Sequence, residues 1–83
     1  MKLKLLYFAR LREQFAMGSE DIELDAGTVA DLLAALRTRG GAWATELAEG
    51  RAFRVGVNQD IAQLNAGLNH GDEVAIFPPV TGG

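Results

Sequence analysis

Residues 28–37 read TVADLLAALR, and this stretch predicts the one long helix of the chain. Thr28 is a good N-cap residue, and Asp31, three positions later, favours the positive end of the helix dipole. Apolar residues recur with the spacing of a single helix face, at Val29, Leu32, Leu33 and Leu36. Gly40-Gly41 follows two arginines and indicates where the helix ends.

Segments with alternating apolar residues lie on both sides of this helix and predict strands. Residues 2–8 place Leu3, Leu5 and Tyr7 on one face and Leu6 and Phe8 on the other. Further strands are expected at residues 22–25, 53–57, 61–62 and 73–77, with turns between the last three. Shorter helical turns are expected at residues 9–17 and near residues 43–47.

This order of elements predicts an α+β fold in which one main helix packs on one face of a mixed sheet. It is the element order of the ubiquitin-like β-grasp. The helix stripe would face the inward residues of three strands, which are Leu3, Leu5, Val55, Val57, Val74 and Ile76. We expect one domain over residues 1–77 and an extended tail over residues 78–83.

The face of the sheet away from the main helix is predicted to be unusually apolar. It would carry Leu6, Phe8, Ala75 and Phe77, although a solvated sheet face should be polar. Two interpretations are open: the short helix of residues 9–17 folds over these side chains, or they form a protein interface. We favour the interface, because the tail leaves from the same strand.

Composition excludes several classes of function. The 83 residues carry a net charge of −3 and no run of basic residues, which argues against partners such as nucleic acid or a membrane. No cysteine is present, so neither a thiolate metal site nor a thiol nucleophile is expected, and no metal is assigned. The first ten residues do not read as a signal peptide, and a cytoplasmic protein is expected. The acidic pairs Glu20-Asp21 and Asp72-Glu73 are interpreted as surface charge.

The closing segment, Phe77-Pro78-Pro79-Val80-Thr81-Gly82-Gly83, has the features of a tail that is delivered into another protein. The two prolines cannot donate to a sheet ladder and stiffen the chain as it leaves the fold. Extended, the segment would reach about 20 Å. Glycine at the last two positions leaves the terminal carbonyl open to attack and lets the backbone pass a narrow channel.

The whole chain resembles the molybdopterin synthase small-subunit family of sulfur carriers. The resemblance lies in residues 6–13 (LYFARLRE), 57–59 (VNQ), 71–74 (GDEV) and above all 77–83 (FPPVTGG). It implies that Gly83 is adenylated by an E1-like activating enzyme that binds ATP, through a transient acyl-AMP. Sulfur from a persulfide would then replace AMP to leave a thiocarboxylate. This chain would bind no cofactor of its own.

The same resemblance implies the partners and the residues that contact them. The charged tail would enter the large subunit of molybdopterin synthase, in a heterotetramer of two small and two large subunits, and donate sulfur to form the molybdopterin dithiolene. Gly83 would carry the sulfur and Gly82 would give access. Phe8, Ile61 and Phe77 match hydrophobic partner contacts, and Arg12 matches a basic residue near them. The tail residues Pro78, Pro79, Val80 and Thr81 would line the entry into the partner.

Three other functions remain open on the sequence. A thiamine-pathway sulfur carrier would share the chemistry, although the residues 77–81 argue against it. A ubiquitin-like protein modifier would instead form an isopeptide bond through Gly83. A plain interaction domain would not need Gly82-Gly83 at all.

Overall fold

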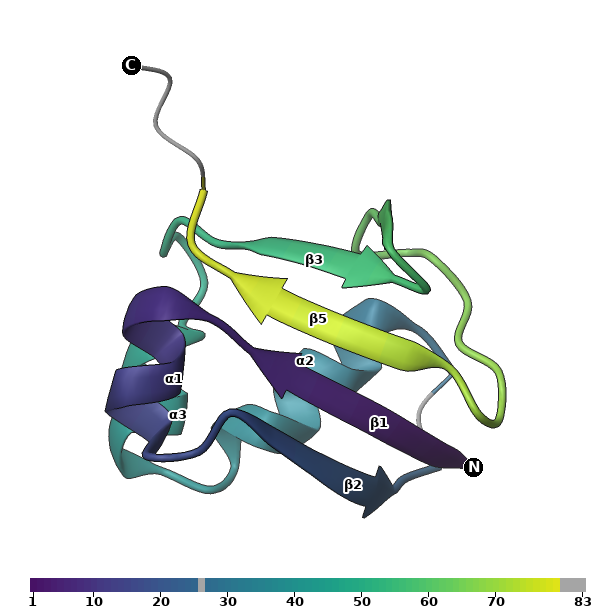
Figure 1. Ribbon diagram of the computed structural model, residues 1–83, viewed down its shortest axis with the longest axis horizontal. Helices are drawn as coiled ribbons and strands as arrows, with labels where there is room; N and C mark the ends of the chain where they lie inside the picture. Colours follow the sequence, from purple (N-terminus) through teal and green to yellow (C-terminus); the bar gives the residue numbers. More distant parts are fainter. Residues whose placement is uncertain (26, 80–83) are drawn as a thin grey trace.

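The computed structural model describes residues 1–25 and 27–79, which form one sheet with three helices packed on it (Figure 1). The elements, in chain order, are β1 (Lys2–Tyr7), α1 (Ala9–Phe15), β2 (Ser19–Glu23), α2 (Val29–Arg37), α3 (Gly41–Glu46), β3 (Arg54–Val57), β4 (Asp60–Ile61) and β5 (Glu73–Phe77). The predicted mixed sheet with a main helix on one face is confirmed.

The strand order is β2-β1-β5-β3-β4, so the first and last strands of the chain lie side by side at the centre. β1 and β5 are parallel, with Leu5 opposite Val74 and Leu6 opposite Ala75, and the other pairs are antiparallel. Because β5 is flanked on both sides, its end is a rigid point from which the chain continues into Pro78 and Pro79.

Helix α2 begins as the sequence predicts. The Thr28 side chain accepts from the Asp31 backbone N–H at 3.2 Å, while the Asp31 carboxylate accepts from the Thr28 N–H at 3.1 Å. This reciprocal capping box satisfies two N–H groups that the helix itself cannot pair. The predicted apolar stripe of α2 is buried against the inward side chains of β1 and β5.

Helix α1 packs on the same side of the sheet as α2 and α3. Its Leu11 and Phe15 belong to the buried core, and the Phe15 ring stacks on Trp43 of α3 with centroids 3.8 Å apart. Tyr7, which points inward from β1, meets both rings edge-on. The interpretation in which this helix covers the opposite face of the sheet is therefore wrong.

Three details differ from the sequence predictions. β1 ends at Tyr7, and Phe8 is the N-cap residue of α1, because the chain turns at Ala9 with a φ of 52°. β2 begins at Ser19, earlier than the apolar alternation indicates. Asp72 is buried, where it accepts from the Asn58 side chain at 2.9 Å and the Asn69 N–H at 2.8 Å.

Two properties of the described residues bear on the class of function. Over residues 1–25 and 27–79, none of the helices has the length and apolar character needed to cross a membrane. The same two ranges contain no group of three or more His, Asp or Glu side chains arranged to hold a metal ion.

Candidate functional site

The central strand β5 carries the segment that the sequence identifies as functional. Pro78 and Pro79 follow it directly, are half-buried, and are joined by trans peptide bonds. The Phe8 N–H donates to the Ile76 carbonyl at 3.3 Å, so the start of α1 is attached to the end of β5. Val80, Thr81, Gly82 and Gly83 lie outside the described residues, and their predicted roles stay predictions.

An apolar patch covers the end of the open face from which the tail leaves. We define it as Leu6, Phe8, Ile61, Ala75 and Phe77. The strand register places Ala75 between Leu6 and Gly56, and Gly56 opposite Ile61, so the patch runs across the sheet from β1 to β4. Phe8 is 45 % exposed and Ile61 66 % exposed. The structure thus brings the three predicted apolar contacts onto one surface.

Gly56 gives this patch its flatness, a role that the sequence analysis did not assign. A Cβ built at Gly56 would lie 3.8 Å from the Phe77 ring and 3.6 Å from the Asp60 carbonyl oxygen. The Phe77 ring therefore lies across the bare backbone of β3. The only signal in the sequence is a glycine at an outward position of an otherwise regular strand.

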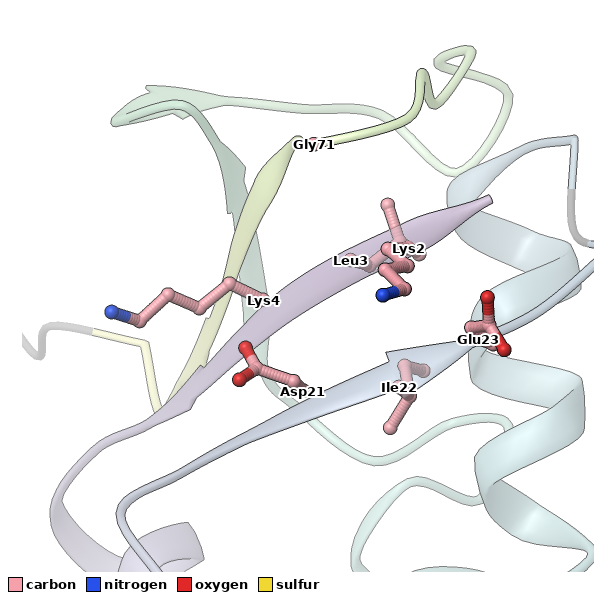
Figure 2. A pocket seen from close by; sticks show the side chains of 7 residues that line it. All are labelled: Lys2, Leu3, Lys4, Asp21, Ile22, Glu23 and Gly71. Carbon is pink, nitrogen blue, oxygen red and sulfur yellow. The ribbon is translucent and has the colours of Figure 1, made fainter.

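The other half of the open face is charged. Register places Lys4 between Asp21 and Glu73, and Lys2 opposite Glu23. A hollow of about 470 Å³ lies at this end. Figure 2 shows two of its lining side chains, Lys4 and Asp21, projecting to the same side of the sheet. Because β1 and β5 are parallel, this hollow lies at the opposite end of the sheet from Phe77 and the tail.

Arg12 lies at the margin of the apolar patch and not within it. It is in α1, where its backbone N–H donates to the Phe8 carbonyl at 3.4 Å. Its side chain lies over Gly18, and a Cβ built at that glycine would come within 3.1 Å of the Arg12 Nε. The predicted basic contact therefore rests on the chain that leads into β2.

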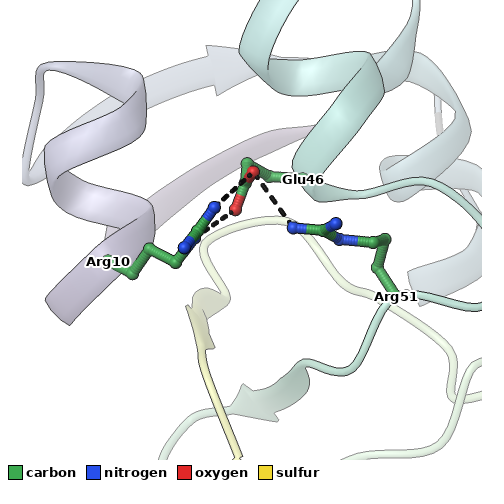
Figure 3. A network of polar contacts seen from close by, with 3 residues as sticks. All are labelled: Arg10, Glu46 and Arg51. Carbon is green, nitrogen blue, oxygen red and sulfur yellow. Dashed lines mark hydrogen bonds and ion pairs between the residues drawn. The ribbon is translucent and has the colours of Figure 1, made fainter.

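A buried carboxylate links α1, α3 and the segment before β3. The Glu46 side chain is only 6 % exposed and accepts from Arg10 at 2.9 Å and from Arg51 at 3.2 Å (Figure 3). The hydrogen bond from Arg10, together with the charges of both arginines, lowers the pKa of Glu46. Arg10 of α1 and Arg51, which precedes β3, are thus paired with one carboxylate.

A second network joins β1, β2 and the end of α2. The Tyr7 hydroxyl donates to Glu20 at 2.7 Å, and Arg39 makes two hydrogen bonds to the same carboxylate at 2.8 and 2.9 Å. Arg39 lowers the pKa of Glu20, whereas burial and the bond to Glu20 raise the pKa of Tyr7. Glu20 is consequently a structural acid and not the free surface charge that the sequence indicates.

Comparisons with known proteins place this geometry in a family. The ThiS family model matches residues 5–83. The chain is 37 % identical over 81 residues to the molybdopterin synthase sulfur carrier subunits of Haemophilus influenzae and Escherichia coli. In both cases the match covers 98 % of this chain and 99 % of the relative.

A solved structure supports the fold over the full length. The crystal structure of SAMP1 from Haloferax volcanii is 30 % identical, covers 100 % of both chains and has a TM-score of 0.82. The predicted ubiquitin-like β-grasp is thereby confirmed. The chain therefore belongs to the ThiS family and, within it, to the sulfur carrier subunits of molybdopterin synthase.

Proposed function

We propose that Gly83 is the sulfur-bearing residue of this carrier. The observation that carries the proposal is the match to sulfur carrier subunits across 99 % of their length, in a family match that extends to residue 83. In this chemistry the Gly83 carboxylate attacks ATP in an E1-like activating enzyme, which forms an acyl-adenylate and releases pyrophosphate. The outer sulfur of a persulfide then displaces AMP to give an acyl disulfide, and a second thiol cleaves its S–S bond and is left in a disulfide with the persulfide's inner sulfur. The product is a thiocarboxylate that donates its sulfur to the pterin precursor.

The fold supports delivery of such a terminus into a partner. Phe77 is paired with Arg54 in a central strand, so the start of the tail is held rigidly while Pro78-Pro79 direct the chain outward. The residues beyond Phe77 could reach about 20 Å when extended. The chain supplies the sulfur and its position, and the large subunit supplies the catalytic groups, in a heterotetramer of two copies of each. ATP for the activating enzyme makes the cytoplasm the expected compartment.

Changes at the terminus test this function directly. Deletion of Gly83, or addition of one residue after it, leaves β5 and the apolar patch unchanged, so the complex with the large subunit should form normally. The reacting carbon would be missing or displaced by about 3.5 Å, and such a misplacement costs orders of magnitude in a positioned reaction. We expect almost no molybdopterin in a reconstituted conversion assay. Normal conversion by the shortened chain would refute the proposal.

The mass of the carrier gives an independent measurement. With activating enzyme, ATP and a sulfur donor, the intact mass should rise by the exchange of one oxygen for sulfur. The same reaction with the shortened chain is the matched control. A wild-type mass that stays at that of the free acid would count against a thiocarboxylate.

A second function, protein modification, is favoured by one comparison. SAMP1 of Haloferax volcanii, a small archaeal modifier protein, has the same fold over the whole chain. A modifier would form an isopeptide bond between Gly83 and lysines of other proteins. Gly-Gly remnants on lysines in a digest of the native host would demonstrate this activity, and variants of Gly83 should abolish them.

A further inference from the structure

The apolar patch is too small to hold a stable subunit interface by itself. Such interfaces bury about 800 Å² per partner from about 20 to 30 residues. That area is about a sixth of the 5018 Å² surface of this chain, whereas the patch consists of five residues. In the proposed function the inserted tail adds to the area of the patch, and a surface next to the patch would add further area to a lasting complex.

An apolar surface continues from the patch around the β3–β4 edge of the sheet. Leu64 is 58 % exposed and lies close to Ile61, a member of the patch. Ile61, Leu64, Phe53 and Arg54 line one hollow of about 400 Å³. Leu64 and Phe53 also line a second hollow of about 350 Å³, which faces Leu33 of α2. These two residues thus form a ridge between two hollows.

Leu64 is exposed on a fixed backbone. Its carbonyl accepts from the Ala30 N–H at 2.9 Å, and the Ala66 carbonyl accepts from the Val29 N–H at 3.0 Å. These bonds satisfy N–H groups in the first turn of α2, which the helix cannot pair internally. Two residues before Leu64, the Ala62 N–H donates to Val55 at 2.8 Å. An apolar side chain on a backbone held in this way loses little entropy on binding, which is typical of an interface anchor.

Three of the eight basic residues of this acidic chain surround the ridge. Arg54 lines the first hollow, while Arg37 and Arg51 line the second together with Glu49. Arg37 is held by the Leu47 carbonyl at 2.8 Å and Arg51 by Glu46 at 3.2 Å. In the part of the chain that the structure describes, no carboxylate lies within ion-pair distance of Arg54. The surface is complementary to apolar residues flanked by acids.

We propose that the ridge of Leu64 and Phe53, with Arg54, is a second docking surface that binds an acidic, apolar segment of the large subunit. The inference rests on the proposed function, because it takes the large subunit as the stable partner. The apolar patch serves every partner that receives the tail. The ridge adds the area and the charge that keep the carrier on the large subunit.

Binding of full-length variants to the large subunit tests the ridge. Leu64→Ala and Arg54→Glu should each weaken the complex about tenfold, the size expected for loss of an interface anchor. Added salt should weaken the wild-type complex more than the Arg54→Glu complex, because salt screens the attraction of the guanidinium. Lys2→Glu is the matched control for Arg54→Glu: Lys2 is also basic and exposed, but it begins β1, at the end of the sheet away from the tail.

The activating enzyme distinguishes the possible outcomes. Thiocarboxylate formation, followed by mass, should proceed at the wild-type rate in Leu64→Ala, whose side chain lies outside the apolar patch. Unchanged binding to the large subunit, with the variants folded by thermal unfolding, would overturn the inference. So would a loss confined to adenylation, or an equal loss with both partners. Failure of the wild-type carrier to acquire sulfur would instead contradict the proposed function and leave the binding comparison intact.

Discussion

On the helix side of the sheet, Leu3, Leu5 and Ile76 are almost completely buried, whereas Leu6, Ala75 and Phe77 on the other side stay half-buried. Both sets come from β1 and β5, and consecutive residues alternate between them. The helix side is closed by α1, α2 and α3, with the Glu20 and Glu46 networks at its margins. The comparison shows that one pair of strands supplies the stability of the fold on one side and an apolar surface on the other.

Leu5 and Leu6 provide the sharpest test of this difference, because they are identical, adjacent residues of one strand. Leu5 is 0 % exposed, and Leu5→Ala should lower the free energy of unfolding by about 2–5 kcal/mol. Leu6→Ala should lower it by less, because Leu6 is only half-buried and loses fewer packing contacts. Denaturant unfolding measures both. Equal losses would mean that the two faces are equally part of the core.

The aromatic residues of the open face should show the opposite behaviour. Phe8→Ala and Phe77→Ala should weaken binding to the large subunit by about ten- to a hundredfold, as expected for aromatic interface anchors. The fold should persist, as judged by thermal unfolding, because neither ring belongs to the buried core. Phe15→Ala is the matched control, since that ring is buried against Trp43 and its loss should destabilise the fold. Unfolding of the Phe8 or Phe77 variant would show that these rings are structural.

The sequence predicted the helix side well because burial there follows simple periodicity. The stripe of α2, its Thr28 cap and the inward residues of β1 and β5 all appear as regular patterns. The sequence analysis was wrong for two acidic residues, Glu20 and Asp72, which it interpreted as surface charge. Glu20 points to the helix side, where it is paired with Arg39 and accepts a hydrogen bond from Tyr7. Asp72 accepts hydrogen bonds from the Asn58 side chain and the Asn69 N–H. Asn58, Tyr7 and Arg39 are distant in the chain from the acids they bind, so local sequence patterns do not reveal these pairs.

The sequence predicted part of the arrangement of the apolar patch. Alternation placed Phe8 and Phe77 on the open face, whereas Ile61 was named only by resemblance, and the strand register places it on the same face. Leu64 could not be recognised, because its exposure depends on bonds to the first turn of α2. Gly18 was likewise missed, since its contact with Arg12 depends on how α1 meets β2.

Acid should lower the free energy of unfolding through the Glu20 network on the helix side of the sheet. Because Arg39 and Tyr7 hold the pKa of Glu20 below its ordinary value of 4.5, the stabilisation is complete above that pH. It is lost as the pH falls below 4.5 through the folded-state pKa. The partly exposed pair should be worth on the order of 1 kcal/mol. Glu20→Gln should reduce the slope of unfolding free energy against pH between about pH 5 and pH 3.

Removal of Arg39 is the control for this pH dependence. Arg39→Met takes away the hydrogen bonds that lower the pKa of Glu20, so Glu20→Gln should change the slope little in that background. A residual slope in Glu20→Gln is expected, because Glu46 also has a lowered pKa. An unchanged slope in Glu20→Gln would show that its ion pair with Arg39 does not stabilise the fold.

The smallest expected effect concerns the margin of the open face, where Arg12 lies over Gly18. A methyl group at Gly18 would come within 3.1 Å of Nε and 3.2 Å of Cζ of Arg12, so Gly18→Ala should displace the guanidinium. The cost to stability should stay within about 0.5 kcal/mol, because the displaced atoms end a flexible side chain. Binding to the large subunit should weaken about threefold, the size of a partly exposed charge contact.

A double-mutant cycle determines whether the glycine acts through the arginine. Gly18→Ala should have no effect on binding in an Arg12→Ala background, because the group that it displaces is already absent. Gly67→Ala is the control, since among residues 1–25 and 27–79 a methyl group there meets only the Gly27 carbonyl oxygen, at 4.0 Å. Additive losses in the cycle would mean that Gly18 acts through its backbone, where its carbonyl accepts from the Tyr7 N–H at 2.9 Å. In that case Gly18 would contribute to the stability of the fold, and the position of the Arg12 side chain would not depend on it.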